Sequence, residues 1–505
     1  MSKKSIVILS LSPIADDPRV RRQGQAFHDA GWSVTAVGVG SSRSPAPDWR
    51  IIQADAPSVM QPAQDAQSPV DTPPADSGTS TPAPMRRRGP RTRLIEFGRA
   101  LIPPEKRHLF RPAVHLFFKI LTLVVRVFLF VKWKIVRLIE AIRGVVALLR
   151  NIRQSSRSAA DKKDSGTGGP AKLSEPDLAL QPLPPPMDPD EAEANYMDVW
   201  EIYRMYQAAH GIKADFYLAN DWHMLPVARQ LARENNARFA YDTHEYAVEE
   251  YRYKPDFLTT KVPMVRAIEA RGLREAAITT AVSAGIARDM AALHCVERVP
   301  VEIRNVPNRV ANLPEPVPTR RRMRVYFHGI ITFDRGLEEC IRSVPLWRPE
   351  FVFQMRGPIR PEFMPTLKAA IIEAGVWDRV EILPEVPMVE LVRAAAQADI
   401  GISTPPSTSK HNIYALPNKF FEYIQAGLAM CVADLPDMRR IMEHYDLGVP
   451  ISAVTPEAIA DAVNRFTPEL VDRYKANARK AAAELNWEME QKRFIALYED
   501  AIQAA

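Results

Sequence analysis

Cysteine is scarce in this 505-residue sequence, which contains only Cys295, Cys340 and Cys431. The three cysteines are scattered through apolar stretches, with no metal-binding spacing and no pattern of a disulfide framework, so a reducing cytoplasm is the expected environment. The sequence also lacks an uninterrupted apolar run near the ~18 residues that a membrane-spanning helix needs. The opening residues, MSKKSIVILSLSPIADD, combine a short apolar run with two acids, which predicts a buried strand rather than a signal peptide.

Two further signatures are missing. No GxGxxG follows the first predicted strand, so a nicotinamide cofactor is not supported. No acidic DxD pattern or cluster indicates a bound metal. We therefore expect neither a cofactor nor a metal in this protein.

Proline, in contrast, is abundant, with 44 residues in a chain whose apolar content is 46%. The apolar content suffices for sizeable cores, and a chain of this length predicts two to four domains. The stretches Ser41–Pro84 and Ser155–Pro189 are rich in Pro, Ser, Ala and polar residues and poor in large apolar ones. Both stretches are therefore expected to be disordered.

Positive charge gathers in one segment. Between Arg86 and Arg157 there are 18 Lys and Arg against three acids, a net charge of +15; since the whole chain carries +6, the remainder carries −9. A basic segment of this kind suits an anionic membrane surface or a nucleic acid. We favour the membrane surface and regard nucleic acid as the lesser hypothesis.

Residues 111–150 are strongly apolar, but cations interrupt them, four of which fall near one side of a helical wheel: Lys119, Arg126, Lys134 and Arg137. A basic face with Phe, Leu and Trp elsewhere predicts an amphipathic helix that lies in the membrane surface. The protein would then be cytoplasmic and peripheral on the inner face of the membrane. A helix packed on the protein's own core, a partner-binding coiled coil and a spanning helix with embedded cations are the alternatives.

Outside that segment, apolar strands alternate with amphipathic helices. Ser5–Leu11, a helix capped by Asp17 that ends at Gly31, and Ser33–Val39 form a strand–helix–strand unit that opens a parallel sheet. A helix over Glu191–His210 and strands at Ala214–Ala219, Arg238–Tyr241 and Ala277–Val282 continue the pattern. A second series has strands at Arg324–Gly329, Phe351–Arg356, Val380–Leu383, Asp399–Ser403 and Leu428–Ala433.

This alternation predicts an α/β protein with two doubly wound domains. The first domain covers residues 1–312 and contains an insert at 41–190. The second covers residues 313–485, beginning with a proline-rich linker. A last helix at 486–505 is expected to cross back to the first domain.

Polar clusters follow two successive strands of the first domain. Asn220-Asp221-Trp222-His223 comes after one strand, and Asp242-Thr243-His244-Glu245 ends the next. In open α/β sheets ligands bind at the carboxyl ends of the strands, so these clusters are candidate ligand-binding loops. Ordinary loop polarity is the alternative.

The second domain has two candidate anion-binding features. In the loop His328–Gly336, Gly329 lets the backbone approach a ligand, and Arg335 offers a planar donor fork for a diphosphate; a salt bridge to Glu338 or Glu339 is the alternative. Asn418 is expected to cap a helix that ends at Gly427, and its N-terminus suits a phosphate. Glu422 lies where a carboxylate could meet sugar hydroxyls, although a surface acid that favours the helix start fits equally well.

The sequence ALPNKFFEYIQAG around that helix resembles the signature of family-four retaining glycosyltransferases, which have the GT-B fold of two Rossmann-like domains facing a cleft. The resemblance implies that Glu422 is the second of two glutamates eight positions apart and contacts the nucleotide ribose. Tyr414 stands at the position of the first glutamate, and His411 or Asn412 are the candidates to replace its contact to the donor sugar.

The resemblance extends to other motifs. The loop His328–Gly336 is similar to the family's glycine-rich phosphate loop, with Arg335 at its cationic position and Ile330 where a second cation is common. The DPRV of residues 17–20 resembles the opening of many members, and the NDWH and DTHE clusters resemble their acceptor-side loops. Asn220 stands where members often have a histidine.

The implied function is a retaining glycosyltransferase that moves a sugar from a nucleotide-diphosphate sugar to a glycan or lipid-linked acceptor at the cytoplasmic membrane face. A non-catalytic scaffold with the same fold and a sugar-nucleotide epimerase are the alternatives. The expected catalytic residues are Arg335, His244 and Asp221. The expected donor-binding residues are Gly329, Arg335, Asn418, Lys419 and Glu422, and the expected acceptor-side residues are Asp17, Arg19, Asn220, His223 and Glu245.

Overall fold

The computed structural model describes residues 3–42, 44–55, 182–252, 254, 256–313, 319 and 322–503. The predicted amphipathic helix at 111–150 lies outside the described residues. So does most of both segments that were predicted to be disordered.

The first sheet has seven parallel strands in the order β3-β2-β1-β4-β5-β6-β7. Its strands alternate with helices along the chain, as buried parallel strands require. They are β1 (Ser5–Leu9), β2 (Ser33–Val39), β3 (Arg50–Ala54), β4 (Phe216–Asn220), β5 (Arg238–Thr243), β6 (Ile278–Ala281) and β7 (Val301–Glu302).

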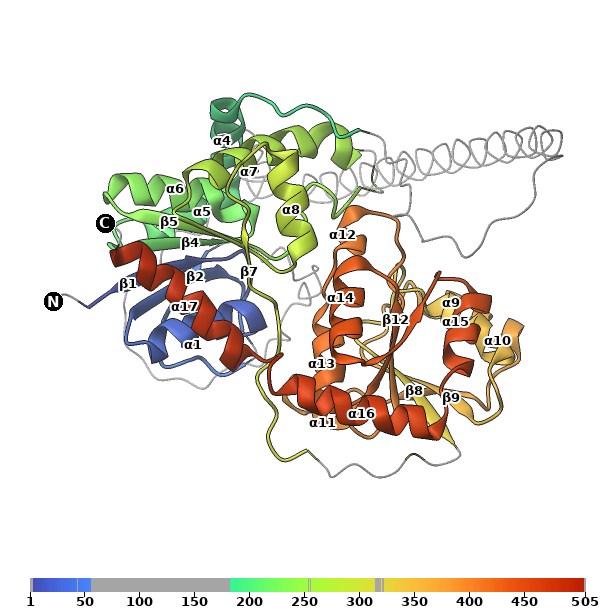
Figure 1. The fold of residues 1–505 in the computed structure, drawn as a ribbon. Helices are drawn as coiled ribbons and strands as arrows, with labels where there is room; N and C mark the ends of the chain where they lie inside the picture. The colour runs from blue at the N-terminus through green and yellow to red at the C-terminus, as the bar shows by residue number, and fades with distance from the viewer. Residues whose placement is uncertain are drawn as a thin grey trace, which may run out of the picture. The chain divides into compact units, whose positions relative to one another are not determined.

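The second sheet has six parallel strands in the order β10-β9-β8-β11-β12-β13. They are β8 (Met323–His328), β9 (Phe351–Arg356), β10 (Val380–Leu383), β11 (Ile400–Ser403), β12 (Ala429–Ala433) and β13 (Gly448–Ile451). Two parallel sheets with intervening helices confirm the predicted α/β class (Figure 1).

Helices cover both faces of each sheet. On the first sheet, α1 (Pro18–Asp29) packs on the face of Ile6 and Phe216, and the other face carries α4 (Pro189–Met197), α5 (Trp200–Ala209), α6 (Leu225–Glu234), α7 (Val262–Glu275) and α8 (Ala284–Leu293). Short turns η2 (Trp222–Met224) and η3 (Phe257–Lys261) precede α6 and α7.

On the second sheet, Phe327 and Phe353 face α9 (Leu337–Ser343), η4 (Val344–Leu346), α10 (Met364–Ala374) and α15 (Pro456–Asn464). The opposite face carries α11 (Leu391–Ala395), α13 (Asn418–Ala426), α14 (Pro436–Tyr445) and α16 (Pro468–Ala482), and a turn with no buried residue, η5 (Met388–Glu390), precedes α11. A short helix, α12 (Lys410–Ile413), precedes α13.

The last helix, α17 (Trp487–Gln503), packs on the first sheet although it follows the second in sequence. Figure 1 shows it beside α1. The Tyr498 ring lies 4.8 Å from Phe27 and 5.2 Å from Phe216, both edge-on, and the backbone N–H of Trp487 donates to Pro307 O at 2.9 Å. These aromatic contacts are typical of a buried core and join the end of the chain to its first sheet.

Strand order reverses once in each sheet, between β1 and β4 and between β8 and β11. At such a reversal the connecting segments leave in opposite directions, and ligands of α/β sheets bind there, beyond the carboxyl ends of the strands. Two predicted loops follow strands at these positions: Asp221 comes directly after β4, and Gly329 directly after β8.

Several predicted elements are wrong in position or were missed. β3 lies inside the stretch that was predicted to be disordered, where it pairs with β2 from Thr35↔Arg50 to Val39↔Ala54. α4 begins within the other such stretch, because Asp188 caps it and Pro189 occupies its first position. The single helix predicted over 191–210 is two helices, which break at Asp198 and Val199. β7 and β13 were not predicted.

None of the helices in the described part of the chain is long and apolar enough to cross a membrane.

Candidate functional site

The two polar clusters of the first sheet come together at its carboxyl edge. β4 and β5 are neighbours in register, with Asn220 opposite Asp242, so the residues that follow both strands lie side by side. The backbone N–H of Asp221 donates to Asp242 O at 2.9 Å, and the backbone N–H of His244 donates to Asp221 Oδ1 at 2.9 Å. Asp221 adopts a left-handed backbone conformation, with φ of 61°.

His244 is enclosed by acceptors. Its Nε2 lies 2.9 Å from Asn220 Oδ1 and 3.0 Å from Asp242 Oδ2, and its Nδ1 lies 3.5 Å from Asp221 Oδ2. Burial disfavours the charged ring, but the Asp221 and Asp242 carboxylates outweigh it and raise the pKa of His244 to about 9. At neutral pH His244 is therefore an imidazolium, which can stabilise negative charge or donate a proton but cannot act as a general base.

Asp242, which belongs to one of the two candidate ligand-binding clusters, is fully buried and anchors this edge. Its oxygens accept from Arg19 Nε at 2.7 Å and from Arg19 Nη2 at 2.6 Å. They also accept from Gln23 Nε2 at 2.7 Å and from Thr280 Oγ1. Burial alone would raise the pKa of Asp242, but Arg19 and the hydrogen bonds hold it well below its usual range. The carboxylate is thus permanently charged and ties α1, β5 and β6 together.

Asp17 and Arg19, which were predicted on the acceptor side, both have partners inside the fold. Asp17 caps α1 by accepting from the backbone N–H groups of Arg19 and Val20, and it also accepts from Ser12 Oγ at 2.7 Å. Arg19 is 2% exposed and occupied by Asp242 and by Ile303 O. These contacts stabilise the carboxyl edge of the sheet, and a contact of either residue with an acceptor stays a prediction.

The other residues predicted on the acceptor side differ in how far they are exposed. Asn220 is buried, and its amide oxygen holds His244. His223 is half-buried and stacks on Trp222 with ring centroids 4.1 Å apart, and burial lowers its pKa. Glu245 keeps an exposed side chain, at 51%, and Asp221 a partly exposed one, at 24%, so these two remain candidates for contact with an acceptor.

Glu245 meets a residue of the second sheet's loops. His411 Nε2 lies 3.4 Å from Glu245 Oε2, and the backbone N–H of Tyr246 donates to His411 Nδ1 at 3.4 Å. Burial and Arg335 lower the pKa of His411 to about 4, so its ring is neutral at neutral pH. Burial, together with the charges of nearby Glu250 and Asp221, raises the pKa of Glu245. Because the side chain is also partly open to solvent, this rise is smaller than burial alone would cause.

Further contacts join the loops that follow both sheets. Gly285 N, in the first turn of α8, donates to Asp437 Oδ2 at 2.9 Å, and Ser283 Oγ donates to Tyr414 O at 2.7 Å. A Cβ at Gly285 would lie 2.3 Å from the Tyr414 ring, so only glycine allows this approach. Tyr414, which stands where the family has its first glutamate, therefore packs against α8.

The donor-side loop after β8 is built on unusual backbone angles. Gly329 has φ of 125°, and Arg335 lies between Asp334 and Gly336, whose φ values are 58° and 66°. Thr404 Oγ1 donates to Arg335 O at 2.9 Å and fixes this turn, while the Arg335 side chain is exposed. Within the described residues the Arg335 guanidinium has no ion pair, so the alternative of a bridge to Glu338 or Glu339 is not realised.

Lys419 lies beside that loop. Its Nζ is 4.4 Å from the centre of the Phe327 ring, and a Cβ at Gly329 would lie 3.7 Å from it. Burial and the neighbouring Arg335 lower the pKa of Lys419 to about 7. Two cations thus lie close together without a carboxylate ion pair in the described part of the chain, an arrangement that an anion would stabilise.

The helix that begins this region starts one residue earlier than predicted. Pro417 occupies the N-cap position of α13 and makes no side-chain hydrogen bond, and Asn418 is the first helical residue. The prediction that Asn418 caps the helix is therefore wrong. The first N–H groups of α13 receive no side-chain cap from position 417, which leaves this helix end open to another acceptor.

Glu422 has a partner that the sequence analysis did not assign. Its Oε2 lies 2.7 Å from Nε2 of His328, the last residue of β8. His328 is 1% exposed, and its Nδ1 has no hydrogen-bond partner in the described part of the chain, so the contact of Nε2 with Glu422 is what fixes the ring. Glu422 keeps 18% of its side chain exposed, so one carboxylate oxygen is held and the other is available.

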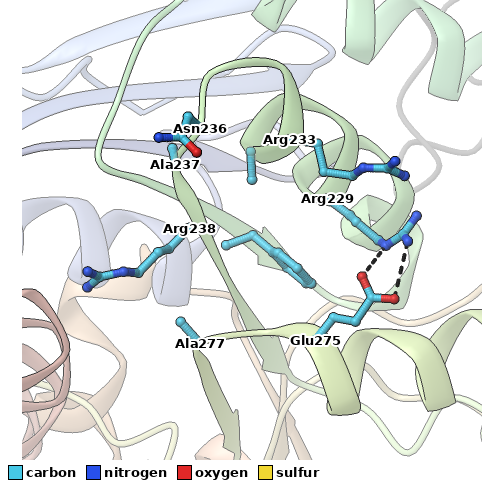
Figure 2. Close-up of a pocket in the computed structure, with 9 residues that line it drawn as sticks. Arg229, Arg233, Asn236, Ala237, Arg238, Glu275 and Ala277 are labelled. Atoms are coloured by element: carbon cyan, nitrogen blue, oxygen red, sulfur yellow. Dashed lines mark hydrogen bonds and ion pairs between the residues drawn. The ribbon is translucent and has the colours of Figure 1, made fainter. Parts of the chain in front are cut away.

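A cavity of about 440 Å³ lies elsewhere, at the amino ends of β5 and β6. Figure 2 shows that its arginines do not converge on a common point: Glu275 holds Arg229, while Arg238 and Arg233 extend away from each other. Since ligands of such sheets bind at the opposite edge, this cavity is not the candidate active site.

Comparison with solved structures identifies the fold. Sucrose-phosphate synthase from Thermosynechococcus elongatus matches with a TM-score of 0.57 at 15% identity, and a glycosyltransferase from Rickettsia africae matches with 0.53 at 11%, each over 100% of both chains. Anabaena HepE, solved with UDP, matches with 0.50 at 15% over 59% of this chain and 81% of its own. No protein-family model and no curated protein matches the sequence.

These neighbours are GT-B glycosyltransferases, and the chain shares their fold of two Rossmann-like sheets. The predicted GT-B fold is confirmed, while membership of family four stays a prediction.

The charge of His244 can be tested by titration. We expect its ring to stay protonated through neutral pH and to titrate near pH 9. Since this folded-state pKa exceeds the ordinary histidine value of 6.5, the imidazolium contributes stability that is complete below about pH 6.5 and is lost as the pH rises toward about 9. Histidine NMR signals followed from about pH 5 to about pH 10.5, roughly 1.5 units beyond these two values, measure the pKa directly.

Asp221→Asn should lower the pKa of His244, because the second-largest influence on that pKa is the Asp221 charge. Asp256→Asn, which changes an exposed acid outside this cluster, serves as the control and should leave the titration unchanged. A ring that titrates near 6.5 in the unaltered protein would contradict the assignment.

Proposed function

We propose that the protein is a retaining glycosyltransferase that transfers a sugar from a nucleotide-diphosphate sugar. The observation that carries the proposal is the pair Arg335 and Lys419. Lys419 lies beside Gly329 at the carboxyl end of β8, and Arg335 belongs to the loop that follows this strand and, together with burial, lowers the pKa of Lys419. Neither side chain forms an ion pair within the described residues. A diphosphate supplies the charge that such a pair lacks.

The chemistry follows from where negative charge develops. Breaking the bond between the anomeric carbon and the diphosphate leaves charge on the departing phosphate. Arg335, Lys419 and the N-terminus of α13 would stabilise that charge as fixed groups that need no reorganisation. Retention of configuration rests on the resemblance of residues 415–427 to the family signature.

The acceptor would enter from the first sheet. Asp221 and Glu245 have exposed carboxylates that can accept hydrogen bonds from sugar hydroxyls, and the imidazolium of His244 lies behind them. We propose a glycan or lipid-linked acceptor. UDP is the first nucleotide to test, because the HepE structure contains it.

We also propose that residues 86–157 bring the protein to an anionic membrane surface on the cytoplasmic side. The support is the net charge of +15 in this segment and its apolar stretches. A non-catalytic scaffold with this fold remains the alternative function. Release of UDP from a UDP-sugar that depends on acceptor and on Arg335 separates the two.

Arg335→Ala should reduce turnover by about a hundredfold or more, because losing one fixed donor to a developing anion costs roughly 2–4 kcal/mol. The fold should be unaffected, since the side chain is exposed. Steady-state release of nucleoside diphosphate measures the effect. Arg342→Ala, an exposed arginine on the following helix, is the matched control. Normal turnover in the Arg335 variant would remove this residue from the mechanism.

Glu422→Ala should weaken the affinity for free UDP by about tenfold or more, because a charge-assisted hydrogen bond to ribose contributes roughly 1.5–3 kcal/mol. Calorimetric titration measures the affinity. Glu457→Ala, at the start of α15, is the control. Unchanged affinity would mean that Glu422 serves to hold His328 and does not contact the nucleotide.

The membrane proposal predicts flotation with anionic liposomes. Binding should weaken with salt, because charge attraction is screened, but it should persist, because burial of apolar side chains is not. Neutral liposomes should float less protein. Deleting residues 86–157 should abolish flotation, preserve activity on a short water-soluble acceptor and reduce activity on a lipid-linked one. If the intact protein stays at the bottom of the gradient with anionic liposomes, the membrane proposal fails.

A further inference from the structure

A second cavity, of about 430 Å³, lies on one face of the second sheet near its β10 edge. Residues two apart on three neighbouring strands line it, since alternate residues of a strand face the same side. β8 contributes Arg324 and Tyr326, β9 contributes Gln354 and Arg356, and β10 contributes Glu381, while Arg322 precedes β8.

The cavity exists because its face of the sheet is incompletely covered. The chain between β10 and β11 forms only η5 and the five-residue helix α11, and the cavity touches only the end of this connection, at Ala394, Gln397 and Ala398. The strands place mostly polar side chains in this space, beside Val352 and Leu383, where the core face of a sheet would carry apolar ones. The lining of this cavity therefore suits a polar ligand.

Positive charge dominates the lining. The carboxylate of Glu381 already has partners, since Gln354 Nε2 donates to it at 2.7 Å and Arg322 lies 3.5 Å away. The guanidiniums of Arg324 and Arg356 donate to the backbone carbonyls of Gln397 and Pro384. Neither forms an ion pair with a carboxylate in the part of the chain that the structure describes.

A buried hydroxyl points to a ligand independently of the charge. Tyr326 is 1% exposed, yet its hydroxyl has no partner in hydrogen-bond geometry, and the same is true of Nε of the nearby Arg356. Both residues line the cavity. Burial raises the pKa of Tyr326, and Arg356 lies close enough to oppose that rise. The hydroxyl oxygen can accept from that guanidinium, but the hydroxyl proton then still lacks an acceptor within the described residues. Buried polar groups are nearly always hydrogen-bonded, so this proton indicates a missing acceptor in the cavity.

We propose that this cavity is a binding site for a small phosphorylated molecule, separate from the proposed donor site. Phosphate oxygens accept from several guanidinium forks and from a hydroxyl at once, which matches the donors present. The volume is within the range of ligand-binding pockets, about 300–1,000 Å³.

The site is placed to influence the donor loop. Arg356 lies opposite His328 in the register of β8 and β9, and its carbonyl accepts from Gly329 N at 3.1 Å. Tyr326 and His328 are two residues apart on β8 and their rings are 5.5 Å apart. A ligand held by Tyr326 and Arg356 therefore touches the two strands that position His328, Gly329 and Glu422.

Calorimetric titration with inorganic pyrophosphate tests the proposal, because it counts sites without requiring activity. We expect two sites in the unaltered protein. Arg335→Ala should remove one, which belongs to the donor loop. Arg322→Gln combined with Arg324→Gln should weaken the other by about tenfold or more, in proportion to the charge-assisted hydrogen bonds lost. Both arginines have exposed side chains, so the fold should persist.

Arg342→Gln, on the opposite face of the same sheet, is the control and should bind like the unaltered protein. Tyr326→Phe removes only the hydroxyl and should weaken the second site severalfold. Citrate in place of pyrophosphate should bind less tightly if the site selects phosphate.

The outcomes separate this proposal from the proposed function. A single site that survives Arg335→Ala and is lost with Arg322 and Arg324 would overturn the donor assignment and support the cavity. If the Arg335→Ala protein binds no pyrophosphate, or binds it equally well after Arg322 and Arg324 are replaced, the cavity is not an anion site.

Discussion

The buried ion pair between Arg19 and Asp242 is the interaction on which the carboxyl edge of the first sheet depends. One carboxylate receives donors from α1, through Arg19 and Gln23, from β6, through Thr280, and from His244 on its own strand's end. A buried pair of this kind adds little stability over apolar residues, but removing one partner costs about 3–5 kcal/mol because the other is left uncompensated. Its effect is therefore to fix geometry: His244 is held, charged, at one place.

The two sheets present unlike charges to the space beyond their strands. The first presents the carboxylates of Asp221 and Glu245. Burial and the charges of Glu250 and Asp221 raise the pKa of Glu245, and the charge of His244 opposes that rise. The second presents Arg335 and Lys419. This division suits a reaction in which a neutral polyhydroxyl acceptor meets an anionic donor, since each substrate finds its complement and is disfavoured on the other side. His411 belongs to the second sheet's loops but is neutral, so its contact with Glu245 adds no charge.

Sequence patterns predicted best what depends on local chemistry. β9 and β10 were predicted to the residue, and Gly427 ends α13 in the left-handed conformation that glycine favours. β3 was missed because Arg50–Ala54 lies in a proline-rich stretch and becomes a strand only by pairing with β2. The role of Arg19 was missed because its partner lies 223 residues away, and no local pattern distinguishes a buried arginine from an exposed one.

The proposed donor site and the cavity on the second sheet share strand β8, and this has a thermodynamic consequence. His328 holds Glu422 at its carboxyl end, and Tyr326 reaches the cavity two residues earlier on the same face. Two ligands that bind one rigid strand affect each other only if the strand has two arrangements that they favour differently. Two such arrangements would differ at the Tyr326 hydroxyl and at His328 Nδ1. Within the described residues both atoms lack a hydrogen-bond partner, and each gains one only if its ring or its surroundings shift. Any coupling must then be reciprocal. If a nucleotide at the loop changes the affinity of the cavity for an anion by some factor, the anion changes the affinity of the loop for the nucleotide by the same factor.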